Sequence, residues 1–249
     1  MSFLSVSGVS KHFGTHVAVH EVSFELTSGE TAVVFGANGA GKTSLIRTLA
    51  SLSRPTQGRI ELGGEELIGG NAGIRSRIGV VTHDTMLYEE LTARENLRLH
   101  ARLHGVDQSV CDGLLEVVGL ADRGSERVSG FSHGMRKRVS LARALVHDPD
   151  VLLLDEPYSG LDQASLKRVT DVLEGLEELT VLAATHDLER GFDLADRVLF
   201  MNRGELVGNL ETDAFETVDA VVDRYDELCR GAVPSSRGRR GLTETTEYR

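Results

Sequence analysis

The stretch Gly36-Ala37-Asn38-Gly39-Ala40-Gly41-Lys42-Thr43 decides the fold of this 249-residue chain. It follows the apolar run Thr31-Ala32-Val33-Val34-Phe35 and precedes Ser44-Leu45-Ile46-Arg47-Thr48-Leu49, an order that predicts a strand, a loop and a helix. Its glycines let the backbone adopt positive φ angles and turn N–H groups toward phosphate oxygens at the positive end of the helix. Lys42 adds a charge for the β- and γ-phosphates, and the Thr43 hydroxyl can bind Mg²⁺. A turn that binds nothing would leave Lys42 without a role, so residues 36–44 are predicted to bind a nucleoside triphosphate.

The composition indicates a globular protein that does not bind nucleic acid. Hydrophobic residues make up 40% and charged residues 26% of the chain, and its formal net charge of −11 would repel a phosphate backbone. Cys111 and Cys229 lie far apart without metal-ligand spacing, which favours free thiols. The sequence has neither the roughly 18 to 20 consecutive apolar residues of a membrane span nor a signal peptide. We therefore expect a cytoplasmic chain that reaches a membrane only through a partner.

Short segments on both sides of the phosphate loop alternate apolar and polar residues, which is typical of half-exposed strands. They comprise residues 3–6, 17–19 and 22–26 before the loop, and residues 58–62 and 78–82 after it. We expect these segments to form an antiparallel sheet beside the phosphate-binding core. The fold class is then α/β, with an antiparallel β subdomain packed on a P-loop core.

A helical period begins near Leu91 and indicates a helical subdomain, at about residues 84–147, inserted in the core. Thr92 and Glu95 have the spacing of a capping box, and Ser132 is a good N-cap for a later helix. His100 and His104 would share one helical face and could bind a metal, but the arginines beside them favour a solvated face.

Two further apolar runs end in titratable side chains. Val151-Leu152-Leu153-Leu154 leads to Asp155 and Glu156, and Val181-Leu182-Ala183-Ala184-Thr185 leads to His186. Strands that are buried on both faces have this pattern, and α/β sheets place their chemistry where such strands end. Adjacent buried carboxylates are costly without a cation to face, which argues against a purely structural role.

These residues suggest one site for a triphosphate and its metal. Lys42 and Thr43 would hold phosphate and Mg²⁺, and Asp155 would hold the same ion. Glu156 is placed to orient or deprotonate an attacking water, and His186 to contact the γ-phosphate and that water. A histidine satisfied within the core is the alternative for His186.

The end of the chain differs from the rest. A hairpin is predicted at residues 197–208, with its turn at Asn202-Arg203-Gly204. Residues 229–249 are rich in Arg, Gly, Ser and Thr and are expected to form a disordered tail after a domain at residues 1–228. Contact between this basic tail and an anionic lipid surface is the alternative.

The chain resembles the ATPase subunits of ATP-binding-cassette (ABC) transporters, over nearly all of residues 2–225. Phe131-Ser132-His133-Gly134-Met135 is similar to the family's signature loop, Ser159-Gly160-Leu161-Asp162 to its D-loop, and His186 to its switch histidine. Phe13 falls where an aromatic residue stacks on adenine. The resemblance implies a P-loop NTPase core of the ABC ATPase type that binds ATP and Mg²⁺.

The resemblance also implies partners. Two ATPase subunits would meet head to tail, so that each ATP lies between one phosphate loop and the Ser132, Gly134 and Asp162 of the other subunit. An integral membrane permease would hold the pair on the cytoplasmic side of the cell membrane as peripheral subunits. The alternative of a soluble ABC-type ATPase acting on DNA or ribosomes fits poorly with one cassette and an acidic body.

The chain departs from the common family pattern at two places. The signature loop has His133 and Met135 where Gly and Gln are usual, and His83 stands at the position of the Q-loop glutamine, where it could still reach Mg²⁺-bound water. Together with residues 86–97 and 155–162, these features are similar to the ATPase subunit of the heme exporter of cytochrome c maturation. Related ATPases of drug, antibiotic and lipid efflux share much of the pattern and remain the alternative.

Overall fold

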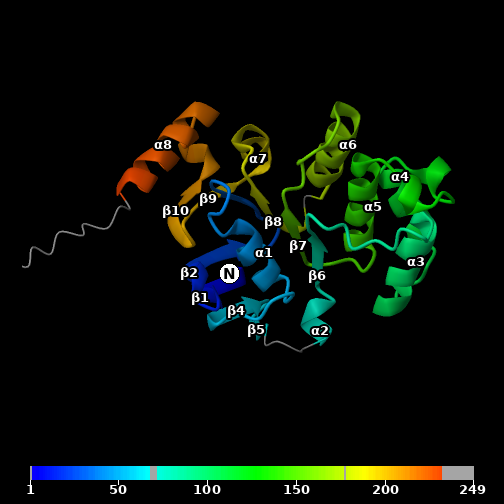
Figure 1. The fold of residues 1–249 in the computed structure, drawn as a ribbon, viewed down its shortest axis with the longest axis horizontal. Helices are drawn as coiled ribbons and strands as arrows, with labels where there is room; N and C mark the ends of the chain where they lie inside the picture. The colour runs from blue at the N-terminus through cyan, green and yellow to red at the C-terminus, as the bar shows by residue number, and fades with distance from the viewer. Residues whose placement is uncertain (1, 68–71, 177, 232–249) are drawn as a thin grey trace, which may run out of the picture.

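The computed structural model describes residues 2–67, 72–176 and 178–231, which form two sheets with helices between and around them (Figure 1). The strands are β1 (Ser2–Phe13), β2 (His16–Thr27), β3 (Thr31–Phe35), β4 (Gln57–Leu62), β5 (Glu65–Glu66), β6 (Ile78–Val81), β7 (Val151–Asp155), β8 (Thr180–Thr185), β9 (Arg197–Asn202) and β10 (Glu205–Glu211). The α-helices are α1 (Lys42–Leu49), α2 (Ala72–Arg75), α3 (Ala93–His104), α4 (Val110–Val117), α5 (His133–Leu145), α6 (Gln163–Glu174), α7 (Leu188–Leu194) and α8 (Val218–Gly231).

The larger sheet positions the phosphate loop. Its strand order is β10-β9-β3-β8-β7-β6, and all neighbours pair in parallel except β10, which runs antiparallel to β9. Because parallel strands share a direction, the carboxyl ends of β3, β7 and β8 lie at the same end of the sheet. The loop before α1 and the residues that follow β7 and β8 therefore meet there.

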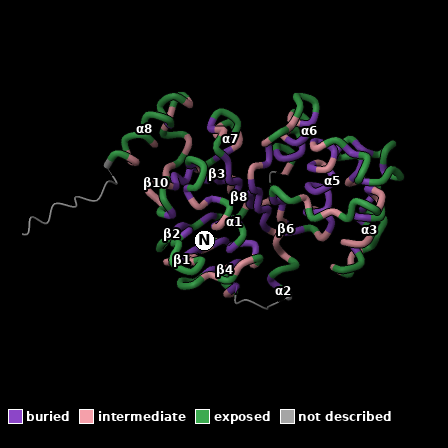
Figure 2. The backbone as a smooth tube through the Cα atoms, in the orientation of Figure 1, coloured by how far each residue is buried: buried purple, intermediate pink, exposed green. Residues whose placement is uncertain are grey.

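The central strands of this sheet are buried on both faces, as their apolar runs predict. Along β7, Val151 and Leu153 pack in a cluster with α1 and the smaller sheet, whereas Leu152 and Leu154 pack in a second cluster with α3 to α6. This alternation follows the two-residue period of a strand. The buried backbone runs through the centre of the molecule (Figure 2).

The smaller sheet is antiparallel as expected, but one predicted member belongs elsewhere. Its order is β2-β1-β4-β5, and β1 and β2 are each 12 residues long, longer than the short segments in the sequence suggested. The prediction that residues 78–82 belong to this sheet is wrong, since β6 pairs in parallel with β7 as the outermost strand of the larger sheet. Gly79 permits this placement, because a Cβ atom there would lie 2.6 Å from the carbonyl oxygen of Ala144 in α5.

The helices α3, α4 and α5 form a helical block at one end of the molecule (Figure 1). The capping box of Thr92 and Glu95 is confirmed, with Thr92 accepting from the Glu95 N–H and the Glu95 carboxylate accepting from the Thr92 N–H. The solvated face expected for His100 and His104 is wrong. Both rings are half-buried, because α3 packs against α5 and the ring of His147 stacks on His104.

At the other end of the molecule, α8 packs beside β10 and follows the predicted hairpin of β9 and β10 (Figure 1). Helix α8 extends to Gly231, past the expected domain end at residue 228. The remainder of the predicted tail, residues 232–249, lies outside the described residues. Across the residues that the structure describes, none of the helices has both the length and the apolar character needed to cross a membrane.

Candidate active site

Backbone sterics fix the shape of the phosphate loop. Gly41, the N-cap of α1, has a φ of 103°, and a Cβ atom there would lie 2.2 Å from the carbonyl oxygen of Ala18. A Cβ atom on Gly36 would lie 2.2 Å from the carbonyl oxygen of Met201. The loop is thus held between β2 and β9, and only glycine fits at these two positions.

Lys42 lies under this loop with its ammonium group among oxygens. Its Nζ atom donates to the carbonyl oxygen of Gly36 at 2.6 Å and to that of Ala37 at 3.3 Å, and it lies 3.7 Å from Oε1 of Glu156. Burial lowers the pKa of the Lys42 ammonium, while the carboxylates of Glu156 and Asp155 act in the opposite direction. The loop, the lysine and Glu156 together line a hollow of about 280 Å³.

Thr43, which lines the hollow, contacts the buried carboxylate of Asp155. The Thr43 hydroxyl donates to Oδ1 of Asp155 at 3.0 Å, and Asp155 ends β7 with only 2% of its surface exposed. Burial raises the pKa of the Asp155 carboxyl, and the hydrogen bond from Thr43 opposes that rise. A hydroxyl and a carboxylate side by side are hard oxygen ligands of the kind that Mg²⁺ prefers, so this donor set fits the ion.

Glu156 joins the ends of two strands. Its N–H donates to the carbonyl oxygen of Ala184 in β8 at 2.8 Å, and its Oε2 atom accepts from Nδ1–H of His186 at 2.8 Å. Glu156 has a φ of 51°, which is unusual for a residue with a side chain. This strained geometry directs the carboxylate toward both His186 and Lys42.

Lys137 is a residue of the site that sequence reasoning missed. It is 2% exposed, and its Nζ atom on α5 donates to the backbone carbonyl oxygen of Glu156. Burial lowers the pKa of the Lys137 ammonium, while the nearby carboxylates of Asp155 and Glu156 act to raise it. In the sequence it stands in the basic run Arg136-Lys137-Arg138, and the local signal for its burial is its place on the helix face of Ser140 and Leu141, which are also buried.

Three other predicted residues lie at the starts of α5 and α6. Ser132 is exposed and caps α5, accepting from the Met135 N–H at 3.3 Å. Asp162 caps α6 and accepts from the Ser165 N–H at 2.7 Å, a contact that lowers the pKa of its carboxyl. A Cβ atom on Gly134 would lie 2.4 Å from Oγ of Ser165, so the starts of α5 and α6 are in close contact.

Not every predicted residue lies at the hollow. Its lining comprises His16, Ala18, residues 38–44 and Glu156, so among the described residues none from 131–135 contributes. Phe13 is 53% exposed at the end of β1, opposite His16 in the strand register, with the Lys11 ammonium 4.9 Å from its ring centroid. His83 is exposed just beyond the end of β6.

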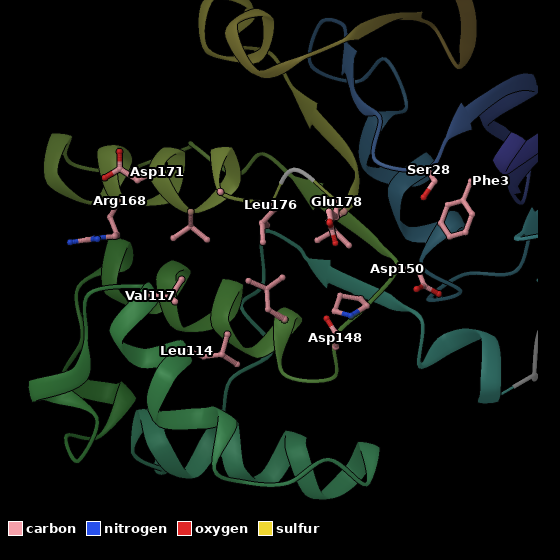
Figure 3. Close-up of a pocket in the computed structure, with 15 residues that line it drawn as sticks. Phe3, Ser28, Leu114, Val117, Asp148, Asp150, Arg168, Asp171, Leu176 and Glu178 are labelled. Atoms are coloured by element: carbon pink, nitrogen blue, oxygen red, sulfur yellow. The ribbon is translucent and has the colours of Figure 1, made fainter. Parts of the chain in front are cut away.

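A larger groove of about 870 Å³ lies away from this chemistry (Figure 3). Its walls include Leu114 and Val117 of α4, Arg168 and Asp171 of α6, and the residues that precede β7. Since β7 begins there and ends at Asp155, the groove opens at the opposite edge of the larger sheet. Size alone therefore does not identify the site of chemistry.

Comparison with known proteins identifies the family. The profile described as ABC transporter matches residues 19–159. The ABC transporter ATP-binding protein NatA of Bacillus subtilis (strain 168) is 39% identical, covering 78% of this chain and 83% of that protein. The daunorubicin resistance ATP-binding protein DrrA3 of Streptomyces coeruleorubidus is 37% identical, covering 92% of this chain and 74% of that protein. The bacitracin transport ATP-binding protein BcrA of Bacillus licheniformis is 34% identical, covering 85% of this chain and 71% of that protein.

The fold agrees with that assignment. A solved ATP-binding subunit of an ABC transporter superposes with a TM-score of 0.81 at 26% identity, covering 92% of this chain and all of that chain. The chain belongs to the ABC transporter family and is an ATPase subunit that binds ATP with Mg²⁺ and couples ATP hydrolysis to transport.

Proposed function

We propose that this chain powers an exporter of drug, antibiotic or lipid molecules. The observation that carries the proposal is the similarity to relatives named for daunorubicin resistance and bacitracin transport, each matched over more than four fifths of this chain. The heme exporter expected from the sequence has no such support among these relatives. That expectation depends on His83, residues 86–97, the signature loop and residues 155–162, a pattern that related efflux ATPases are expected to share in large part.

The hydrolytic step is proposed to take place at the ends of β3, β7 and β8. Lys42 would leave the carbonyl oxygens of Gly36 and Ala37 to contact the β- and γ-phosphates, since a phosphate is the better partner for a buried ammonium. Thr43 and Asp155 would hold Mg²⁺, which when bound neutralises the charge that develops on the phosphates.

Glu156 is proposed as the general base. Its carboxylate lies within reach of Lys42 on one side and His186 on the other, and it is half-buried at the rim of the hollow. An attacking water would give its proton to Glu156 while His186 holds the carboxylate in position. Lys137 would fix the backbone of Glu156 from beneath.

The complete site is proposed to need a second copy of the chain. Because the capped start of α5 at Ser132 is exposed and does not line the hollow, its N–H dipoles are available to the ATP of a partner subunit. Gly134 keeps that helix start close to α6, where Asp162 is exposed as well. A head-to-tail pair would hold each ATP between one phosphate loop and the opposite helix start.

We place the pair on the cytoplasmic side of the cell membrane, bound to an integral membrane permease. The experiment is deletion of the gene in its own organism, followed by measurements of antibiotic susceptibility and of heme-loaded cytochrome c. Increased susceptibility with unchanged cytochrome c supports the proposal. Loss of heme-loaded cytochrome c with unchanged susceptibility would contradict it and would support heme export instead. A Lys42→Ala chain that fails to complement the deletion would tie either phenotype to ATP.

A further inference from the structure

A cluster of three histidines lies in the helical block, apart from the nucleotide site. His100 and His104 come from α3, and His147 follows α5. One nitrogen of each ring lies within 4.8 Å of the corresponding nitrogens of the other two. The ring centroids are 4.6 Å apart for His100 and His104, 4.1 Å for His104 and His147, and 5.7 Å for His100 and His147.

The contacts of His147 leave one of its ring nitrogens available. Its Nε2 atom lies 3.2 Å from the carbonyl oxygen of Ile78, to which it can only donate, so Nδ1 carries the lone pair. Among the described residues Nδ1 is buried and has no hydrogen-bond partner. A histidine fixed by donating one N–H to a carbonyl oxygen, with its other nitrogen free, is the usual arrangement of a metal ligand.

Burial keeps the rings of the cluster neutral, and a neighbouring charge adds to this effect. Burial lowers the pKa of His100 to about 3 and that of His147 to about 4, and it lowers the pKa of His104 as well. Arg143 contributes to all three shifts and would also repel a metal ion, whereas Asp148 acts in the opposite direction on His147. Arg143 itself donates to the Val80 carbonyl oxygen at 2.7 Å. Neutral imidazoles need lose no proton before they bind a metal.

We propose that His100, His104 and His147 form a Zn²⁺ site with its fourth position open to water. Three imidazole nitrogens suit Zn²⁺ and not Mg²⁺ or Ca²⁺, which separates this site from the oxygen ligands Thr43 and Asp155. Tetrahedral Zn–N bonds of about 2.0 to 2.1 Å bring ligand nitrogens to about 3.3 Å of one another. The rings of His104 and His147 are stacked with 19° between their planes, so zinc binding requires side-chain rotations that turn both lone pairs toward one ion.

Bound zinc would link parts of the fold that are distant in sequence. It would join the last two turns of α3 to His147, two residues beyond the end of α5, and through the Ile78 carbonyl to the start of β6. The helical block would then be fastened to the edge of the larger sheet. Zinc should therefore raise the unfolding temperature without nucleotide present.

The test is zinc titration of the untagged full-length chain without nucleotide, by calorimetry and by equilibrium dialysis with metal analysis. We expect one Zn²⁺ per chain, an upward shift of Tm, and Co²⁺ binding with the visible absorption of a tetrahedral nitrogen site. His104→Gln and His147→Gln should each weaken zinc binding at least about tenfold, the lower end of what losing only an outer partner of a ligand costs. His20→Gln, an exposed histidine on β2, should bind zinc as the parent does.

Two results would overturn the proposal. One is the absence of stoichiometric zinc binding to the parent chain. The other is binding that His104→Gln and His147→Gln leave unchanged or that His20→Gln weakens equally, which would indicate scattered surface histidines. Circular dichroism verifies the fold of each variant, and if His147→Gln does not fold, His104→Gln decides the question.

Discussion

Nδ1 of His186 lies 2.8 Å from Oε2 of Glu156, so the residues that follow β7 and β8 share one hydrogen bond. The pair exists because β7 and β8 are parallel neighbours and end together. Since a carboxylate only accepts, the ring donates from Nδ1, which leaves Nε2 free to face a phosphate. Glu156 is the half-buried member and His186 the exposed one.

Replacing His186 by Ala should reduce kcat by about 10²-fold, within the range for a group that assists proton transfer. The affinity for ATP should change little, because the phosphates are held chiefly by Lys42 and the loop residues that line the hollow. Steady-state hydrolysis and nucleotide binding measure the two effects. His20→Ala serves as the matched control, and an unchanged kcat in His186→Ala would show that the pair has no part in turnover.

Replacing Lys137 by Met should lower the free energy of unfolding by about 1 to 3 kcal/mol, because the Glu156 carbonyl loses its buried donor. It should also reduce kcat more than it changes KM, since Glu156 is positioned through this contact. Urea unfolding and kinetics measure these effects. Lys167→Met is the control, because its exposed ion pair with Asp171 should contribute less than about 1 kcal/mol. Equal stability of the two variants would contradict the role given to Lys137.

Comparing Gly41→Ala with Gly64→Ala distinguishes the stability cost of a steric clash from the cost of backbone strain. Both glycines have positive φ angles, 103° and 80°, so each substitution should cost about 1 to 2 kcal/mol in strain. At Gly41 the new Cβ would lie 2.2 Å from the Ala18 carbonyl oxygen and 2.8 Å from Cε of Met201, whereas nothing lies within 4 Å at Gly64. Gly41→Ala should therefore lose more stability and also lose ATP affinity. Equal Tm values for the two variants would be inconsistent with the loop geometry.

The histidine cluster predicts that stability depends on pH. The pKa of His147 falls from about 6.5 to about 4 on folding, so between these values the unfolded chain binds the extra proton. The free energy of unfolding should keep its full value above about pH 6.5. It should decrease as the pH falls from about 6.5 to about 4. Urea titrations at several pH values, with a chelator present, measure the free energy of unfolding. Its slope against pH should be smaller in His147→Gln. His20→Gln should keep the parent slope, and an unchanged slope in His147→Gln would contradict the lowered pKa.

The sequence predicts features that depend on neighbours along the chain. The phosphate loop, the capping box at Thr92 and the helix start at Ser132 are set by local backbone chemistry, and they were anticipated at those residues. Features that depend on tertiary packing were not. Lys137 reaches Glu156 only because α5 packs near the end of β7, and His147 joins the other two histidines only because α3 packs on α5.

Strand partners were predicted only in part for the same reason. A short apolar run such as Ile78–Val81 has no signal for which sheet it joins, and its placement follows from the packing of α5 against it. Helix α8 was not anticipated, since its apolar residues become informative only when β9 and β10 provide a surface that buries Val221.

The central claim is that Glu156 activates water in a site completed by a second subunit. The most direct measurement compares wild type with Glu156→Gln in ATP turnover and in molar mass by light scattering, with Mg²⁺ and ATP present. The amide keeps the shape but cannot take a proton, so we expect turnover to fall by about 10²- to 10⁴-fold while ATP still binds and a dimer persists. Hydrolysis by Glu156→Gln at the wild-type rate, or ATP-bound chains that remain monomers, would contradict the account.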